Sequence, residues 1–252
     1  MTSERAVGSG EAANDRKAPS PSLFECADLT AGYGDLEIVH GFSMRCETTE
    51  IVGVIGPNGC GKSTLMKRLA GLLQARSGRI SFRGRDLTSY HAGQLARAGL
   101  HYVPQERDIF PSLTVRENLL LGEVSPALLD VAIDTVNPEL RKLLHRKAGR
   151  LSGGERKSLG VARALMKPHL DVLLLDEPSA GLSPVASARL WPVIAQVAER
   201  GVAVVVVEQR VEEFLPIAGR VYVMVDGQNR MEEEAPVLLA NLDKLAGVFM
   251  GA

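Results

Sequence analysis

The 252-residue sequence is poor in the features that mark secreted, zinc-bound and membrane-spanning proteins. Its three cysteines, Cys26, Cys46 and Cys60, have no paired spacing, which argues against a disulfide framework or a zinc site. The longest apolar runs, such as residues 202–207, are far shorter than the ~20 residues that a membrane helix needs. Residues 1–22 contain no apolar stretch and do not resemble a signal peptide. We therefore expect a soluble, cytosolic chain.

The sequence also lacks an excess of either charge. Its 29 basic and 30 acidic residues give a net charge of −1, which offers no bulk attraction to nucleic acid. Hydrophobic residues make up 45% and charged residues 23%, an ordinary globular balance. Trp191 is the one tryptophan, and we expect it to pack in the core. The five histidines show no metal-ligand spacing: His40, His91, His101, His145 and His169.

The chain divides into a polar tail and a long body. Residues 1–22 are rich in Ser, Gly, Ala, Pro and charge, and we expect a disordered tail that is either solvated filler or a partner-binding segment. Short alternating segments from 23 to 50 predict antiparallel strands. Residues from about 92 to 150 have helical periodicity interrupted by prolines, which predicts a mostly helical insertion.

Continuous apolar runs indicate buried parallel strands at residues 51–55, 172–176, 202–207 and 221–225. Helical stretches separate them, and Leu65, Leu69, Leu72 and Leu73 follow the first strand at helical spacing. Alternation of this kind predicts an α/β fold with a mostly parallel sheet that is covered on both faces.

A glycine-rich loop follows the first of these strands and opens a helix. It fits G-x-x-x-x-G-K-[ST], the Walker A pattern or P-loop, whose backbone N–H groups face phosphates at a helix N-terminus. Lys62 is placed to neutralise β- and γ-phosphate charge, Ser63 to ligate Mg²⁺ and Thr64 to contact the α-phosphate. The full loop reads Gly56, Pro57, Asn58, Gly59, Cys60, Gly61, Lys62, Ser63 and Thr64. An ordinary glycine turn before a helix would not need this complete motif.

An acidic pair ends the strand at residues 172–176. Adjacent carboxylates at the end of a buried strand are unfavourable unless they meet a cation or water. We expect Asp176 to hold Mg²⁺, through water, and Glu177 to polarise an attacking water. A plain strand-to-loop boundary is the alternative, which the preceding P-loop disfavours.

A second glycine loop, Leu151-Ser152-Gly153-Gly154-Glu155, opens another predicted helix. Ser152 and Glu155 have the spacing of a capping box, which by itself explains both residues. It does not explain two consecutive glycines, which weaken a helix unless something must approach the backbone closely. A γ-phosphate at this helix terminus would account for Gly153 and Gly154.

With both loops in place, residues 23–252 resemble an ATP-binding cassette (ABC) ATPase, the nucleotide-hydrolysing subunit of an ABC transporter. The resemblance implies a P-loop NTPase (RecA-like) core with an N-terminal antiparallel β subdomain and a helical subdomain at about 92–163. It also implies ATP and Mg²⁺ as ligands and a working pair of cassettes. Two rival functions are a soluble ABC protein acting on ribosomes or DNA, and a degenerate cassette that binds ATP only as a regulatory element.

The resemblance assigns roles residue by residue. Tyr33 matches the aromatic that stacks on adenine, and Gln105 matches the Q-loop glutamine that senses Mg²⁺ and the attacking water. Residues 151–155 match the signature segment, which contacts ATP held by the opposite cassette. Residues 179–183 match the loop through which the two cassettes communicate.

Further segments resemble the ATPases of branched-chain amino acid, urea and amide importers, namely residues 102–115, 207–209 and 248–251. This likeness implies transmembrane permease subunits, a second ATPase subunit and, indirectly, an extracytoplasmic solute-binding protein, with the chain held at the cytoplasmic face of the membrane. Phe110 and Pro111 are candidate docking residues for the permease, or simply a packed turn.

Two departures from the family pattern stand out, at Gln209 and at the pair Arg156 and Lys157, and Cys60 raises a separate question. Gln209 stands where most cassettes have a histidine that contacts the γ-phosphate; glutamine donates a hydrogen bond but cannot titrate. Arg156 and Lys157 stand where the similar importers usually have glutamines, which predicts added positive charge near the partner's nucleotide. Cys60 lies in the P-loop beside Lys62, so it is either a thiol of lowered pKa or a small residue at a variable position.

Overall fold

A computed structural model describes residues 23–106 and 108–250, so the expected tail at 1–22 lies outside the described residues. The first sheet has the order β2-β1-β4-β5. Its strands are β1 (Phe24–Tyr33), β2 (Leu36–Cys46), β4 (Ala75–Phe82) and β5 (Arg85–Asp86), and all the pairs are antiparallel. The antiparallel strands predicted between 23 and 50 are therefore confirmed.

The second sheet has six strands in the order β10-β9-β3-β8-β7-β6. Its central strands are β3 (Ile51–Ile55), β7 (Val172–Asp176), β8 (Ala203–Glu208) and β9 (Arg220–Val225), which confirms the four predicted apolar strands. They pair in parallel, as β6 (Leu100–Val103) does with β7. Only the edge strand β10 (Gln228–Glu234) pairs antiparallel, with β9. The parallel strands bring their carboxyl ends to one edge of the sheet, where Ile55, Asp176 and Glu208 end theirs.

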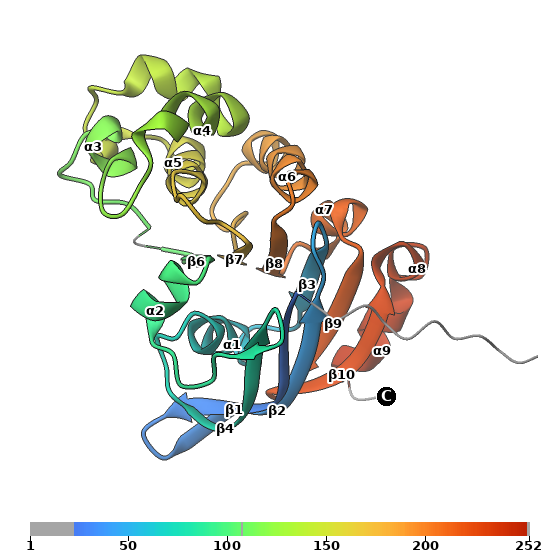
Figure 1. Ribbon diagram of the computed structural model, residues 1–252. Coiled ribbons are helices and arrows are strands. Elements are labelled where there is room, and N and C mark those ends of the chain that lie inside the picture. Colours follow the sequence, from blue (N-terminus) through green and yellow to red (C-terminus); the bar gives the residue numbers. More distant parts are fainter. Residues whose placement is uncertain (1–22, 107, 251–252) are drawn as a thin grey trace, which may run out of the picture.

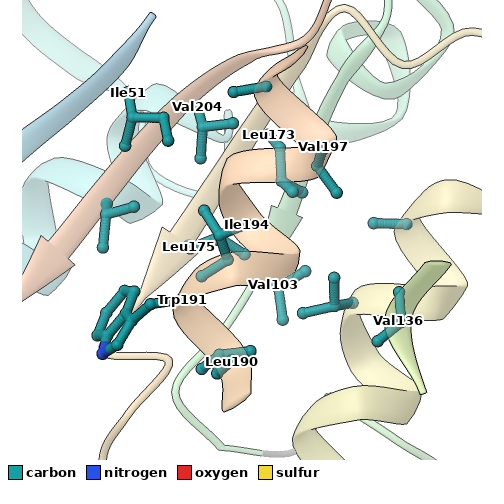
Figure 2. Close-up of a cluster of buried hydrophobic side chains, with 14 of the residues drawn as sticks. Ile51, Val103, Val136, Leu173, Leu175, Leu190, Trp191, Ile194, Val197 and Val204 are labelled. Carbon is teal, nitrogen blue, oxygen red and sulfur yellow. The ribbon is translucent and has the colours of Figure 1, made fainter. Parts of the chain in front are cut away.

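Helices cover both faces of this sheet. On one face, α6 (Pro184–Glu199) turns Trp191, Ile194 and Val197 onto β7 and β8 (Figure 2). Trp191 is 4% exposed and its ring lies 5.5 Å from that of Phe214, so its predicted packing role is confirmed. On the other face, α1 (Lys62–Leu69) packs in a second core together with β1 and β2.

The helical part follows β6 and ends with α5 (Gly153–Leu165). It contains α3 (Val115–Leu119), α4 (Leu129–Val136) and the 3₁₀ helices η1 (Pro126–Leu128), η2 (Pro138–Leu143) and η3 (Ala148–Arg150). In Figure 1, α3, α4 and α5 gather at one end of the molecule, across β6 to β8 from α1. The periodicity interpretation missed β6 inside the expected insertion: residues 100–103 pair with β7, and only α2 (Ala92–Arg97) precedes them.

The predicted helix after the P-loop is shorter than expected. It begins at Lys62 as predicted but ends at Leu69, and Gly71 has φ +69°, a left-handed conformation that ends a helix. Leu72 is consequently 55% exposed rather than on the core-facing stripe.

The C-terminal part completes the second sheet. It comprises α7 (Val211–Phe214), η4 (Leu215–Ile217), α8 (Ala235–Leu239) and α9 (Asp243–Met250) around β9 and β10. Within the described ranges, no helix has the length and apolar character required to cross a bilayer.

Candidate functional site

The P-loop connects β3 to α1 over residues 56–61, and three of its positions require glycine: Gly56 because of a close contact, and Gly59 (φ +80°) and Gly61 because of their backbone conformation. A Cβ at Gly56 would lie 2.1 Å from the carbonyl oxygen of Met224. Gly61 has φ +107°, which side chains rarely tolerate, directly before the first residue of α1. The loop is thus packed against β9 behind it, with the N-terminus of α1 at its end.

Lys62 is folded into this loop and is only 4% exposed. Its Nζ donates to the carbonyl oxygens of Gly56, at 2.8 Å, and Pro57, at 3.0 Å. The positive charge is therefore held inside the glycine turn by weakly accepting main-chain groups. A phosphate oxygen is a stronger acceptor for the same ammonium.

Asp176 ends β7 and is 3% exposed. Its Oδ1 accepts a hydrogen bond from Ser63 Oγ at 3.1 Å, and its Oδ2 accepts one from Tyr102 Oη at 2.9 Å. Burial raises the pKa of the Asp176 carboxyl, while the two hydroxyl donors counteract that rise. Of the three predicted metal residues, the structure joins Ser63 and Asp176 directly, while the third, Gln105, bonds to the neighbouring Glu177.

This pair of oxygens fits a magnesium ion that is also held by phosphates. Mg²⁺ usually keeps several waters and takes one or two carboxylates in addition to substrate phosphates. The hydroxyl of Ser63 and a carboxylate oxygen of Asp176 already face each other at 3.1 Å beside the P-loop. No group of three or more Cys, His, Asp or Glu side chains suited to a metal occurs in the described part of the chain.

Glu177 lies next to this pair and is held by two amides. Gln105 Nε2 donates to its Oε2 at 2.9 Å, and Gln209 Nε2 donates to its Oε1. The main-chain N–H of Glu177 donates to the carbonyl of Val207 at 2.9 Å, and its φ is +44°, a strained value for a residue with a side chain. The three predicted catalytic residues therefore meet. The amides of Gln105 and Gln209, which come from segments far apart in the chain, both contact the carboxylate of Glu177.

Two contributing residues were missed by sequence reasoning. Tyr102 was noted only as part of a segment, and its hydroxyl could be linked to Asp176 only once β6 was known to lie beside β7. Glu208 is 2% exposed and accepts main-chain N–H groups from Gln209 at 2.8 Å, Arg210 at 3.2 Å and Ser179 at 3.3 Å. It thereby joins the turn formed by Gln209 and Arg210 to the loop after Glu177.

Tyr33 ends β1 near the P-loop helix. Its side chain is 43% exposed, and its hydroxyl accepts a hydrogen bond from Lys67 Nζ at 3.3 Å. An exposed ring anchored at one edge in this way leaves a face available for stacking.

The signature segment opens α5 as predicted. Ser152 Oγ accepts the N–H of Glu155, and Glu155 Oε2 accepts the N–H of Ser152 at 2.7 Å, which confirms the capping box. A Cβ at Gly153 would meet its nearest neighbours only at 3.8 Å, so packing within the chain does not require glycine there. Among the described residues, Ser152 bonds only within the first turn of α5, and α5 lies across the sheet from α1 in Figure 1. The structure does not join the signature segment to the P-loop of the same chain.

The geometry bears on two of these points, Cys60 and Lys157. Cys60 is 6% exposed, and burial raises its pKa although Lys62 counteracts the rise, so it is not a thiol of lowered pKa. Lys157 does not add charge to the surface: it is 8% exposed and bonds to main-chain carbonyls. Arg156 alone of that pair is exposed.

Replacing Tyr102 with Phe tests the contact with Asp176. Loss of the hydroxyl donor should raise the Asp176 pKa further, so a larger fraction of the carboxyl is protonated on the acid side. We expect the acid limb of the pH–rate profile for ATP hydrolysis to move to higher pH, and the Mg²⁺ concentration for half-maximal rate to rise severalfold. Tyr90→Phe, which removes only an exposed contact with Arg85, is the matched control. A profile identical to that of the control would contradict the role of Tyr102.

Comparison with known proteins supplies the family. The ABC transporter family matches residues 39–180, more than half of the chain. The high-affinity branched-chain amino acid transport ATP-binding protein BraG of Pseudomonas aeruginosa is 39% identical over 87% of this chain and 95% of its own length. A probable branched-chain amino acid transport ATP-binding protein, LivF, of Archaeoglobus fulgidus is 36% identical over 91% and 99%. The lipopolysaccharide export ATP-binding protein LptB of Acidithiobacillus ferridurans is 34% identical over 82% and 88%.

Solved structures agree with the sequence relatives. The ADP conformation of an ATP-binding cassette from an ABC transporter is similar with a TM-score of 0.81 and 27% identity, over 92% of this chain and 100% of the other. A nucleotide-free cassette from an ABC transporter has the same TM-score at 26% identity and the same coverage. The predicted P-loop NTPase fold is confirmed, and the chain belongs to the ABC transporter family as an ATP-binding cassette that hydrolyses ATP.

Proposed function

We propose that the chain binds Mg²⁺–ATP on the P-loop and hydrolyses it with Glu177 as the acceptor of a proton from the attacking water. The observation that carries this proposal is the arrangement around Glu177: two amides fix both carboxylate oxygens, next to the Ser63–Asp176 pair. A general base must be oriented before it can act, and this carboxylate is oriented by side chains from two other segments of the chain.

The other side chains have complementary roles in this proposal. Lys62 would exchange its bonds to Gly56 and Pro57 for phosphate oxygens. Ser63 and Asp176 would hold Mg²⁺, which, when bound, neutralises charge on the phosphates. Gln209 orients Glu177 and can donate to a phosphate, but it carries no titrating proton. Gln105 would position Glu177 through its amide N–H and sense Mg²⁺ and the attacking water.

A second cassette would complete the nucleotide site. The support is Gly153, the first residue of α5. Packing within this chain does not require a glycine at that position. Backbone N–H groups and the helix dipole favour an anion there. The signature segment of one cassette would thus cover the ATP held by Lys62 of another, either a copy of this chain or a different ATPase.

In this proposal the cassette binds and drives a transmembrane permease, and it lies on the cytoplasmic face of the membrane. Phe110 is 48% exposed beside the Q-loop, and Arg163 lies 5.4 Å from its ring centre. An exposed aromatic side chain held near Gln105 suits contact with a permease helix whose movement must affect the nucleotide site. The names of the relatives favour branched-chain amino acids as the imported solute. The sequence resemblance leaves urea and amides as the alternatives. An extracytoplasmic binding protein would deliver that solute.

A regulatory cassette without turnover is disfavoured by the intact contacts of Asp176 and Glu177. An exporter subunit is the second candidate, because LptB proteins are also among the relatives. No feature of this sequence favours a soluble ABC protein that acts on ribosomes or DNA.

Transport by the reconstituted complex tests the proposed function. The chain would be purified with the permease proteins that co-purify with it, placed in vesicles with the solute-binding protein, and supplied with ATP on the cassette side. We expect uptake of labelled leucine to exceed uptake of urea, and to disappear with Glu177→Gln. Failure of any polytopic membrane protein to co-purify with the chain would contradict the transporter assignment, whereas uptake of urea alone would change only the solute.

A further inference from the structure

Lys157 lies in the second turn of α5 and is buried, with 8% of its surface exposed. Its Nζ donates to the carbonyl oxygens of Gln105 and, at 3.4 Å, of Pro104. Both acceptors belong to the Q-loop, of which residues 104–106 and 108 are described. The ammonium thus attaches the helix that begins at the signature segment to the loop that carries Gln105.

The charge of Lys157 has no ion-pair partner within 23–106 and 108–250; its hydrogen bonds go to these two carbonyls. Burial lowers its pKa, and the carboxylates of Asp108 and Asp176 counteract that effect from a distance. A buried charge that is satisfied only by main-chain carbonyls is unfavourable if the loop moves away, because the ammonium is then left without acceptors. The contact therefore favours one position of the Q-loop.

The same face of α5 contacts the Q-loop at two more points. Arg163 donates to the carbonyl oxygen of Asp108. Gly160 leaves room for the Asp108 carboxylate, since a Cβ there would lie 2.3 Å from its Oδ2. Residues 157, 160 and 163 are spaced by three and share one helix face. Helix α5 therefore contacts the Q-loop near both ends of that loop.

We propose that Lys157 is a positioning residue that couples the signature helix to Glu177 through Gln105. The coupling path consists of contacts already described: Lys157 to the Gln105 carbonyl, and Gln105 Nε2 to Glu177 Oε2 at 2.9 Å. A shift of α5 when its N-terminus engages a nucleotide would move the Q-loop and so re-aim the carboxylate. This inference rests on the proposed role of Glu177 and adds to it a link between signature helix and base.

The test compares ATP hydrolysis by the full chain and four variants: Lys157→Met, Gln105→Ala, the double variant and Lys142→Met. Lys142 makes only an exposed pair with Glu139, so it controls for the loss of a lysine. We expect Lys157→Met to lower kcat about 10-fold with KM for ATP within about twofold, since small displacements of reacting groups reduce turnover more than binding. The double variant should be no slower than Gln105→Ala, because both changes break one path.

A kcat for Lys157→Met equal to that of Lys142→Met would overturn the inference, and so would losses that multiply in the double variant. If Lys157→Met does not unfold cooperatively, Lys157→Gln takes its place under the same two criteria. Glu177→Gln distinguishes a failure of the coupling from a failure of the proposed function. If it loses turnover while Lys157→Met does not, only the coupling is wrong; if it keeps turnover, the proposed function itself fails.

Discussion

Glu177→Gln is expected to lower ATP turnover by about 10²–10³-fold while leaving ATP affinity within a fewfold of the original. The substitution keeps the shape of the side chain but removes its ability to accept a proton. The neighbours, Gln105 and Gln209, both donate to Glu177 and have no pKa near neutrality, so neither replaces the base. Steady-state phosphate release and equilibrium binding of a labelled nucleotide measure the two quantities.

A second readout of Glu177→Gln is the state of assembly. If hydrolysis reopens the pair, the variant should remain ATP-bound and paired, seen as a dimer-sized species with its natural partner cassette at saturating ATP. Asp86→Asn, an exposed carboxylate of β5, serves as the matched acid-to-amide control and should turn over normally. Turnover in Glu177→Gln equal to that of this control would contradict the assignment of the base.

Lys62→Met is expected to weaken ATP binding by roughly 100-fold. Hydrogen bonds to charged groups contribute about 1.5–3 kcal/mol each, or ~10–150-fold in affinity, and the Lys62 ammonium is placed inside the P-loop where phosphates would lie. Methionine keeps the length and apolar stem but removes the charge. Binding of a fluorescent ATP analogue measures the loss.

Folding must be separated from binding in this variant, because Lys62 is buried and bonds to Gly56 and Pro57. Thermal unfolding without nucleotide reports whether the domain is intact, and Lys142→Met again controls for a lost surface lysine. A folded Lys62→Met protein that binds ATP as tightly as the control would show that the P-loop lysine is not the anion anchor.

The local part of the site was predictable from the sequence. The P-loop and the capping box are set by residues within a few positions of one another, and their geometry follows from helix termini and glycine conformations. Lys62 begins α1, and Ser152 and Glu155 exchange hydrogen bonds, as the spacing predicts. The buried apolar strands were equally clear because both of their faces are covered.

Contacts between distant segments were not predictable in this way. Tyr102 reaches Asp176 across 74 positions because β6 pairs with β7, and Lys157 reaches the Gln105 carbonyl across 52 because α5 packs against the segment after β6. The spacing of residues within one sequence does not predict contacts of this kind. The resemblance to the family supplied the roles of Gln105 and Gln209, but not the two amides on one carboxylate.

Two local errors have physical causes. The leucine periodicity after the P-loop continues to Leu73, but the left-handed conformation of Gly71 ends α1 before it. The strand β10 was missed because its sequence, Gln228 to Glu234, is dominated by polar and charged residues. As an edge strand it pairs only with β9, and such charges protect an exposed edge from further pairing.

The most direct measurement is a structure, by crystallography or electron microscopy, of Glu177→Gln assembled with its partner cassette in ATP and Mg²⁺. The account predicts that the γ-phosphate of one ATP contacts Lys62 of this chain and the signature segment of the other cassette, with Gln105 and Gln209 beside residue 177. Nucleotide bound on the P-loop with no signature segment against it, in a closed pair, would contradict the account.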